Sequence, residues 1–238
     1  MDLRNINQVI EELFYEFATW IALAPKTFLR AFFKPAWIQE WVSEEFAKDQ
    51  ASRFKNFLNP FIVWLFSILI ILWSVATTET ESTFQEFIVF LVIFIIFPEA
   101  FAVVMLRAQG IHLDGNVFRR PFYIQMMVFG VFQAVFGMAL AVSSYLLESG
   151  LLDTQTGDLL ESLFVLAGSL FALGLILLPF LWLPIAQIIV MNKELKRGFF
   201  RALGWAFAGL FILLVISITL PTLSTELETF AQLVNFNR

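Results

Sequence analysis

Five long stretches that are almost free of charge constrain this chain more than any other feature. A membrane-spanning helix needs about 20 apolar residues, rising about 1.5 Å each, to cross about 30 Å of hydrocarbon. Each stretch reaches that length, although Pro98 and Glu99 interrupt the second. The long fourth stretch counts once, because Pro179 and Pro184 are expected to kink it or to release its last turns onto the interface. The sequence therefore predicts five transmembrane helices, at residues 57–77, 86–106, 121–147, 162–191 and 202–222.

The composition agrees with a chain that lies in lipid. Hydrophobic residues make up 59% of the 238 residues and charged residues only 15%, whereas a water-soluble domain carries about a quarter charged residues. The chain has no cysteine and one histidine, which excludes disulfides and thiolate metal sites and most haem sites. The expected fold class is an all-α polytopic membrane bundle. No catalytic, metal-binding or cofactor-binding residues are predicted, and the chain is expected to be non-enzymatic.

The basic residues predict the orientation of the bundle. Of the 15 lysines and arginines, seven lie in residues 1–56, three in 107–120 and four in 193–201. In the two remaining loops, every charged residue is acidic. Because basic loops stay on the cytoplasmic side during insertion, the N-terminus is expected inside and the tail, residues 226–238, outside. Residues 57–225 are then the transmembrane bundle of a cell membrane, the inner one in a bacterium, or of an endomembrane in a eukaryote.

Residues 1–56 are predicted to form cytoplasmic amphipathic helices. Apolar residues recur at helical spacing from Ile6 to Ile21, and Pro25 is expected to end that helix before a second stripe follows Pro35. Three interpretations of the segment are open: an interfacial anchor on the inner leaflet, a docking surface for a protein partner, or a cover for its own bundle. The candidate interfacial anchors are Trp20, Trp37 and Trp41.

One ionisable residue falls within a predicted span. Glu99 lies in the cytoplasmic half of the second span, and an ionisable group there indicates an ion path, a relay or a buried partner. Gln125, Gln187 and Arg201 lie at comparable depths, so these four residues are a candidate intramembrane polar cluster. The alternative is that Glu99 only packs, paired or protonated, or reaches headgroup water. The single His112 is expected to be a loop residue, and no motif indicates nucleic acid binding.

Small residues four positions apart recur in the spans and allow close helix approach in lipid. They serve packing within the chain or, alternatively, a homodimer or a larger membrane complex. The pairs are Gly130 and Ala134, Gly137 and Ala141, Gly168 and Ala172, and Gly204 and Ala208.

Two runs flank the start of the first span: KTFLRAFFKP, residues 26–35, and RFKNFLNPF, residues 53–61, which enters the span. With these runs and its five-span layout, the chain resembles the Yip family of Ypt/Rab-interacting membrane proteins and similar bacterial five-span proteins. The layout extends over residues 26–222. The resemblance implies a five-span fold and a role in membrane organisation.

Three functional hypotheses follow. The first is a non-enzymatic Yip-like scaffold or membrane-organising protein that acts through residues 1–56. The second is a transporter or permease component with a polar cavity around Glu99. The third is an accessory subunit of a larger bioenergetic membrane complex. The lipid bilayer is the expected partner in all three.

A topology reporter tests the predicted orientation. A reporter fused after Arg238 should read as non-cytoplasmic, because five crossings separate it from a cytoplasmic N-terminus. The matched control is the same reporter fused within the 193–201 loop, which should read as cytoplasmic. The same reading at both positions would contradict the fifth span.

Overall fold

The computed structural model describes residues 3–49, 52–77, 84–112, 115–148, 159–195, 198–212 and 215. Over these residues the chain is all-α, which confirms the predicted secondary structure class. Its helices are α1 (Leu3–Phe33), α2 (Pro35–Phe46), α3 (Pro60–Thr77), α4 (Phe84–Gln109), α5 (Gly115–Glu148) and α6 (Leu159–Leu195). An apolar helix, Phe199–Ile212, follows α6.

The helices α3 to α6 correspond one by one to the first four predicted spans. Two described helical segments, Val117–Leu146 and Val165–Leu195, are long and apolar enough to cross a membrane, whereas Pro60–Ser74 and Phe199–Ile212 are apolar but shorter. The fifth predicted span begins in the last of these. Most of its remainder and the whole predicted tail lie outside the described residues, so the count of five spans stays a prediction.

The predicted helix end at Pro25 is wrong, because α1 continues through it to Phe33. A proline inside a helix removes one N–H donor and crowds the carbonyl four residues earlier. Pro25 is exposed, so the carbonyl that loses its donor can be solvated. The next turn gains a hydrogen bond from Thr27 Oγ1 to the Leu23 carbonyl at 2.8 Å. Likewise, α6 continues through Pro179 and Pro184, and its last turns stay helical.

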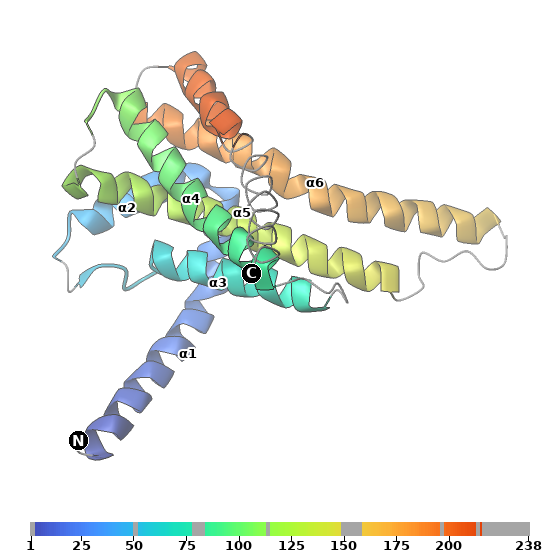
Figure 1. Cartoon of the computed structure of the whole chain (residues 1–238), viewed down its shortest axis with the longest axis horizontal. Coiled ribbons are helices and arrows are strands. Elements are labelled where there is room, and N and C mark those ends of the chain that lie inside the picture. Colours follow the sequence, from blue (N-terminus) through green and yellow to red (C-terminus); the bar gives the residue numbers. More distant parts are fainter. Residues whose placement is uncertain are drawn as a thin grey trace, which may run out of the picture.

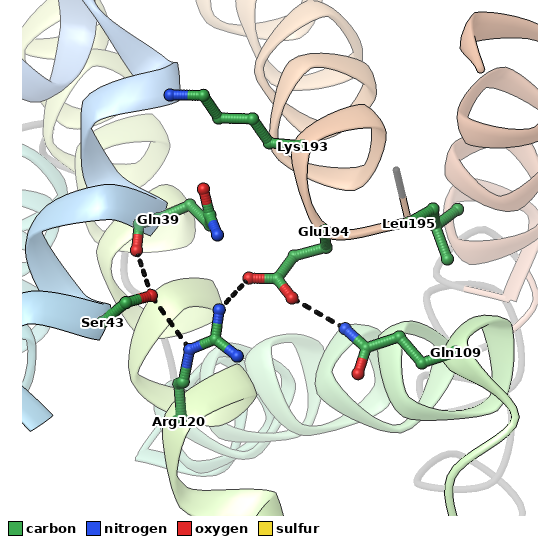
Figure 2. Close-up of a pocket in the computed structure, with 7 residues that line it drawn as sticks. All are labelled: Gln39, Ser43, Gln109, Arg120, Lys193, Glu194 and Leu195. Atoms are coloured by element: carbon green, nitrogen blue, oxygen red, sulfur yellow. Dashed lines mark hydrogen bonds and ion pairs between the residues drawn. The ribbon is translucent and has the colours of Figure 1, made fainter. Parts of the chain in front are cut away.

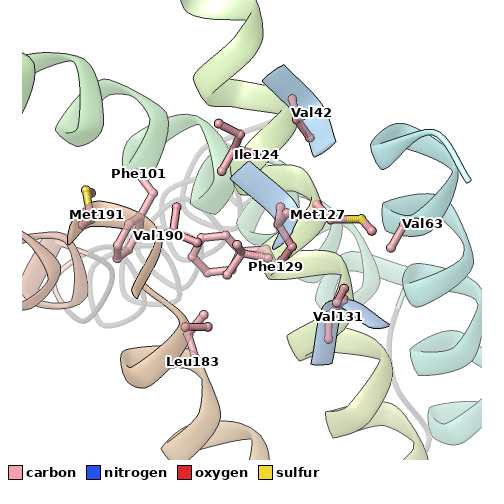
Figure 3. Packing of buried hydrophobic residues seen from close by; sticks show 14 of the residues in the cluster. Val42, Val63, Phe101, Ile124, Met127, Phe129, Val131, Leu183, Val190 and Met191 are labelled. Atoms are coloured by element: carbon pink, nitrogen blue, oxygen red, sulfur yellow. The ribbon is translucent and has the colours of Figure 1, made fainter. Parts of the chain in front are cut away.

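The helix α5 lies at the centre of the molecule and packs against α3, α4, α6 and α2 (Figure 1). Its buried side chains join those of the four neighbours in one apolar core, shown in Figure 3. Phe129 of α5 meets Phe101 of α4 edge to face, with ring centroids 5.3 Å apart. The N-terminal half of α1 projects away from this core, while its C-terminal half joins it (Figure 1).

Two glycines of α5 set its distance from α3. A Cβ at Gly130 would lie 3.1 Å from the backbone nitrogen of Trp64, and one at Gly137 would lie 3.0 Å from side chain atoms of Ile70 and Ile71. Side chains there would force the two helices apart. The small residues at 130 and 137 therefore serve packing within the chain, whereas a Cβ at Gly204 would meet nothing within 4 Å.

The segment between α2 and α3 is fixed by the carboxylate of Glu45. Burial alone would raise its pKa, but hydrogen bonds from Lys48 Nζ at 2.6 Å and from the Phe54 backbone N–H at 2.7 Å outweigh burial and lower the pKa. Phe54 has φ of 60°, which is uncommon for a residue with a side chain. Its ring stacks on Tyr123 at 6.0 Å, and Arg53 donates to the carbonyls of Phe46, the last residue of α2, and of Lys48 just beyond it. This geometry holds α2 beside α5.

The glycine contact predicts the outcome of a matched pair of substitutions. Gly130→Leu should lower the free energy of unfolding by about 1–3 kcal/mol, because the added atoms overpack the α3–α5 contact. Gly204→Leu should leave stability unchanged, since that position is exposed. Thermal unfolding of the purified chain in detergent measures both. Equal losses at the two positions would contradict the packing role of Gly130.

Candidate functional site

A polar pocket opens where α4 ends, α5 begins and α6 ends, with α2 lying across them (Figure 2). Its volume is about 510 Å³. Polar and charged side chains form most of its wall, which consists of Gln39, Ser43, Gln109, Arg120, Lys193, Glu194 and Leu195. Five of these residues belong to the 107–120 and 193–201 segments, which the charge pattern predicts to be cytoplasmic.

Glu194 and Arg120 form the centre of the pocket wall. Arg120 Nη2 lies 2.5 Å from Glu194 Oε1, and Gln109 Nε2 donates to the other carboxylate oxygen at 2.8 Å. The Glu194 side chain is only 4% exposed, so these two donors take the place of water around its carboxylate. Arg120 Nε also donates to Ser43 Oγ of α2 at 3.0 Å. A single guanidinium therefore ties α5 to α6 and to α2.

Lys193 makes a second link between α6 and α2, and this link is exposed. Its ammonium forms an ion pair with Glu40, and the two side chains are 36% and 55% exposed. The same nitrogen lies 3.5 Å from the Ala36 carbonyl oxygen. Exposed pairs of this kind contribute about 0–1 kcal/mol. Lys193 can therefore exchange its partner at little cost.

The chemistry of the pocket is that of recognition. The Ser43 hydroxyl donates to the Gln39 carbonyl at 2.6 Å and accepts from Arg120, and no base stands beside it among the pocket residues. Within the described parts of the chain, no group of three His, Asp or Glu side chains is placed to hold a metal ion. What the pocket offers is charged and amide donors around an already paired carboxylate.

The structure brings together two of the four residues of the candidate intramembrane cluster. Gln187 Nε2 donates to Gln125 Oε1 at 2.7 Å, and both side chains are fully buried between α5 and α6. Glu99 and Arg201 are exposed, and among the described residues neither forms a hydrogen bond or ion pair with the buried glutamines. Glu99 therefore lies on the outer surface of α4, outside the buried pair.

A second buried amide, Gln133, joins α5 to α3. Ser67 Oγ lies 2.6 Å from the Trp64 carbonyl oxygen and 2.9 Å from the Gln133 amide. One hydroxyl hydrogen can serve only one of these partners. The amide orientation that turns its NH₂ group toward Ser67 satisfies the hydroxyl, the carbonyl and the amide nitrogen together. Each buried amide thus has at least one partner on a neighbouring helix, while Gln187 Oε1 has none among the described residues.

The three tryptophans predicted as interfacial anchors face the protein. Trp41 is buried, and Trp20 and Trp37 pack partly buried against the core. Trp37 and Trp41 stack on each other at 5.0 Å, and the Arg30 guanidinium lies 4.7 Å from the Trp37 ring. These rings therefore join α1 to α2, and the exposed aromatic residues of α1 are Phe14, Tyr15, Phe17 and Phe33.

In the sequence, Arg120 and Lys193 stand out only as markers of orientation, and Glu194 was not predicted as a site residue. Glu194 is the only acid in the 193–201 loop, which holds four basic residues. An isolated acid in a basic loop is a usable signal for a structured ion pair. Gln39, Ser43 and Gln109 carry no such signal. Comparison with known protein families, curated proteins and solved structures finds no match to this chain.

A double-mutant cycle tests the centre of the pocket. Arg120→Gln should lower the free energy of unfolding by about 2–3 kcal/mol, because it leaves the covered Glu194 carboxylate without its charged partner. Adding Glu194→Gln should recover part of that loss. Thermal unfolding of the four proteins gives the coupling energy, and Arg119→Gln, at an exposed neighbour, is the control that should change little. Strictly additive losses would contradict the pairing.

Proposed function

We propose that the chain is a non-enzymatic, integral membrane protein that organises the cytoplasmic leaflet, or partners on it, through α1 and α2. In this proposal, five helices cross the membrane, with the basic loops and the polar pocket on the cytoplasmic side. The supports are the sorting of charges, the apolar outer surface of the bundle and the way α1 is mounted.

The outer surface of α6 supports placement in lipid. In the most apolar 18 residues of Val165–Leu195, only 33% are buried inside the protein. The corresponding stretch of α5 is 67% buried. Burying one large apolar side chain is worth about 1.5–3 kcal/mol, so leaving many of them in water is unfavourable. The exposed residues spread over a broad arc of the helix: Leu166, Leu170, Phe171, Leu173, Leu177, Leu178, Phe180, Leu181 and Ile185.

The attachment of α1 to the bundle is the observation that best supports the proposed role. Thr27 Oγ1 accepts a hydrogen bond from the Leu58 backbone N–H at 3.1 Å. Near the end of α1, Trp182 Nε1 of α6 donates to the Phe32 carbonyl at 2.8 Å, and the two rings stack at 5.5 Å. Lys26 also lies over the Phe57 ring at 4.4 Å. The C-terminal half of α1 is therefore held to the bundle at several points.

The N-terminal half of α1 projects from that anchored half as an amphipathic arm (Figure 1). Phe14 is 70% exposed, and Phe17 and Ile21, on the same face, are also exposed. Glu12 and Glu16 lie on the opposite, exposed face, and the exposed Glu11 lies at the boundary between the two faces. A helix with one apolar and one charged face fits the boundary between headgroups and acyl chains. The arm is thus a surface presented to the leaflet by a fixed base.

The alternative of a transporter with a cavity around Glu99 has less support. Glu99 is exposed, and the buried amides at 125 and 187 bond to each other. The described pocket lies instead at the end of the bundle, with Arg120 and Glu194 in its wall. The proposal of an organising role therefore takes precedence over transport.

Single-cysteine labelling tests the arm directly, because the chain has no cysteine of its own. Phe14→Cys and Glu12→Cys place a fluorophore on opposite faces, since side chains two positions apart in sequence point about 200° apart around a helix. In vesicles with brominated acyl chains, the probe at 14 should be quenched by lipid and the probe at 12 by aqueous iodide. Equal iodide quenching at both positions would show that both faces of the arm are exposed to water, which would contradict the proposal.

A further inference from the structure

We propose that the polar pocket binds a phosphate group, carried by an anionic phospholipid of the cytoplasmic leaflet or by a soluble phosphate ester. The assignment of the phosphate chemistry comes from the pocket itself. Only the choice of a lipid as its source rests on the proposed membrane placement, because the charge pattern puts this end of the bundle at the level of the cytoplasmic headgroups.

The charged side chains that line the pocket are Arg120, Lys193 and Glu194, a net charge of +1, and the two loops to which they belong are basic in the sequence. The 107–120 loop holds three arginines against Asp114, a net charge of +2, and the 193–201 loop holds four basic residues against Glu194, a net charge of +3. The residues of these loops that line the pocket are Gln109, Arg120, Lys193, Glu194 and Leu195. Basic pockets between membrane helices on the cytoplasmic side suit lipid phosphates.

The acid in the pocket wall does not oppose an incoming anion as an unpaired charge would. Both Glu194 oxygens accept hydrogen bonds, one from Arg120 and one from Gln109, and the side chain is 4% exposed. Its role is to orient the guanidinium. With the partners that the described residues provide, Nε and Nη2 of Arg120 are engaged and Nη1 is left over. A guanidinium held by two partners is pre-organised, which reduces the entropy lost on binding.

Lys193 supplies the second cation. Its present partner, Glu40, is more than half exposed, so the pair contributes little and can open. The long flexible stem of a lysine lets its ammonium turn from Glu40 to an anion that enters beside it. Figure 2 shows the Lys193 stem and the Arg120 guanidinium on the wall of the same pocket, with the Gln39 amide also there. A phosphate between them would receive charge-assisted hydrogen bonds from two basic side chains.

The test uses the full chain purified in detergent, with binding followed by native mass spectrometry and thermal unfolding. The ligands are phosphatidylglycerol, glycerol 3-phosphate, and a neutral diacyl glycolipid without phosphate. The variants are Lys193→Gln, which removes the exchangeable cation, and Arg119→Gln, which removes an exposed charge that does not line the pocket. Neither variant breaks the Arg120 to Glu194 pair, so both should fold.

We expect saturable binding of a phosphate ligand and none of the glycolipid. Lys193→Gln should weaken binding by about tenfold or more, the loss of one charged hydrogen bond. Arg119→Gln should weaken it by no more than about fivefold, the effect of one charge near an anionic surface. Binding of phosphatidylglycerol alone identifies a lipid as the source, whereas equal binding of glycerol 3-phosphate identifies a soluble ester.

Two results would overturn the inference. Equal weakening by both variants would mean diffuse attraction to basic loops, and a lack of saturable binding by either phosphate ligand would mean no site. The glycerol 3-phosphate measurement in detergent does not depend on membrane placement. Its outcome is therefore separate from the outcome of the arm experiment, which tests the proposed function.

Discussion

The close approach of α5 to α3 is the contact on which the rest of the structure depends. With no Cβ at Gly130 and Gly137, the two helices meet nearly backbone to backbone, which fixes both their distance and their register. Once α5 is held, its other faces position the remaining elements: Phe129 against Phe101, Gln125 against Gln187, and Arg120 against α2 and α6. A slip of α5 by one residue would move these groups by about 1.5 Å, enough to break a hydrogen bond.

The polar groups are sorted by depth in a way that suits a bundle in lipid. Neutral amides take the interior positions, where Gln125 pairs with Gln187 and Gln133 meets Ser67. Charged pairs stand at the end of the bundle, where Arg120 and Lys193 retain some exposure. A buried neutral amide that keeps a hydrogen bond costs less than a buried charge, which also loses its hydration. The division places each charged pair where at least one partner keeps contact with solvent.

Features that depend on neighbours in sequence were predicted well, and features that depend on distant contacts were not. Long apolar runs predicted the helices α3 to α6 with bounds that differ by at most six residues, because a helix satisfies its own backbone whatever surrounds it. Pro25 was expected to end α1, but local propensity does not reveal that the bundle anchors the helix on its far side, through Thr27 and Phe32. The polar pocket was missed for the same reason, since Ser43 and Arg120 are 77 residues apart.

The ties that hold α2 differ in how easily they open, and this difference bears on how the pocket and the arm relate. The Glu45 carboxylate is buried and bonded on both oxygens, and the Trp37 and Trp41 rings are packed between α1 and α2. The pair between Lys193 and Glu40 is the exposed one. Opening it would leave the buried ties intact, so a ligand could recruit Lys193 without releasing α2. The pocket can therefore respond to its ligand while the base of α1 stays fixed.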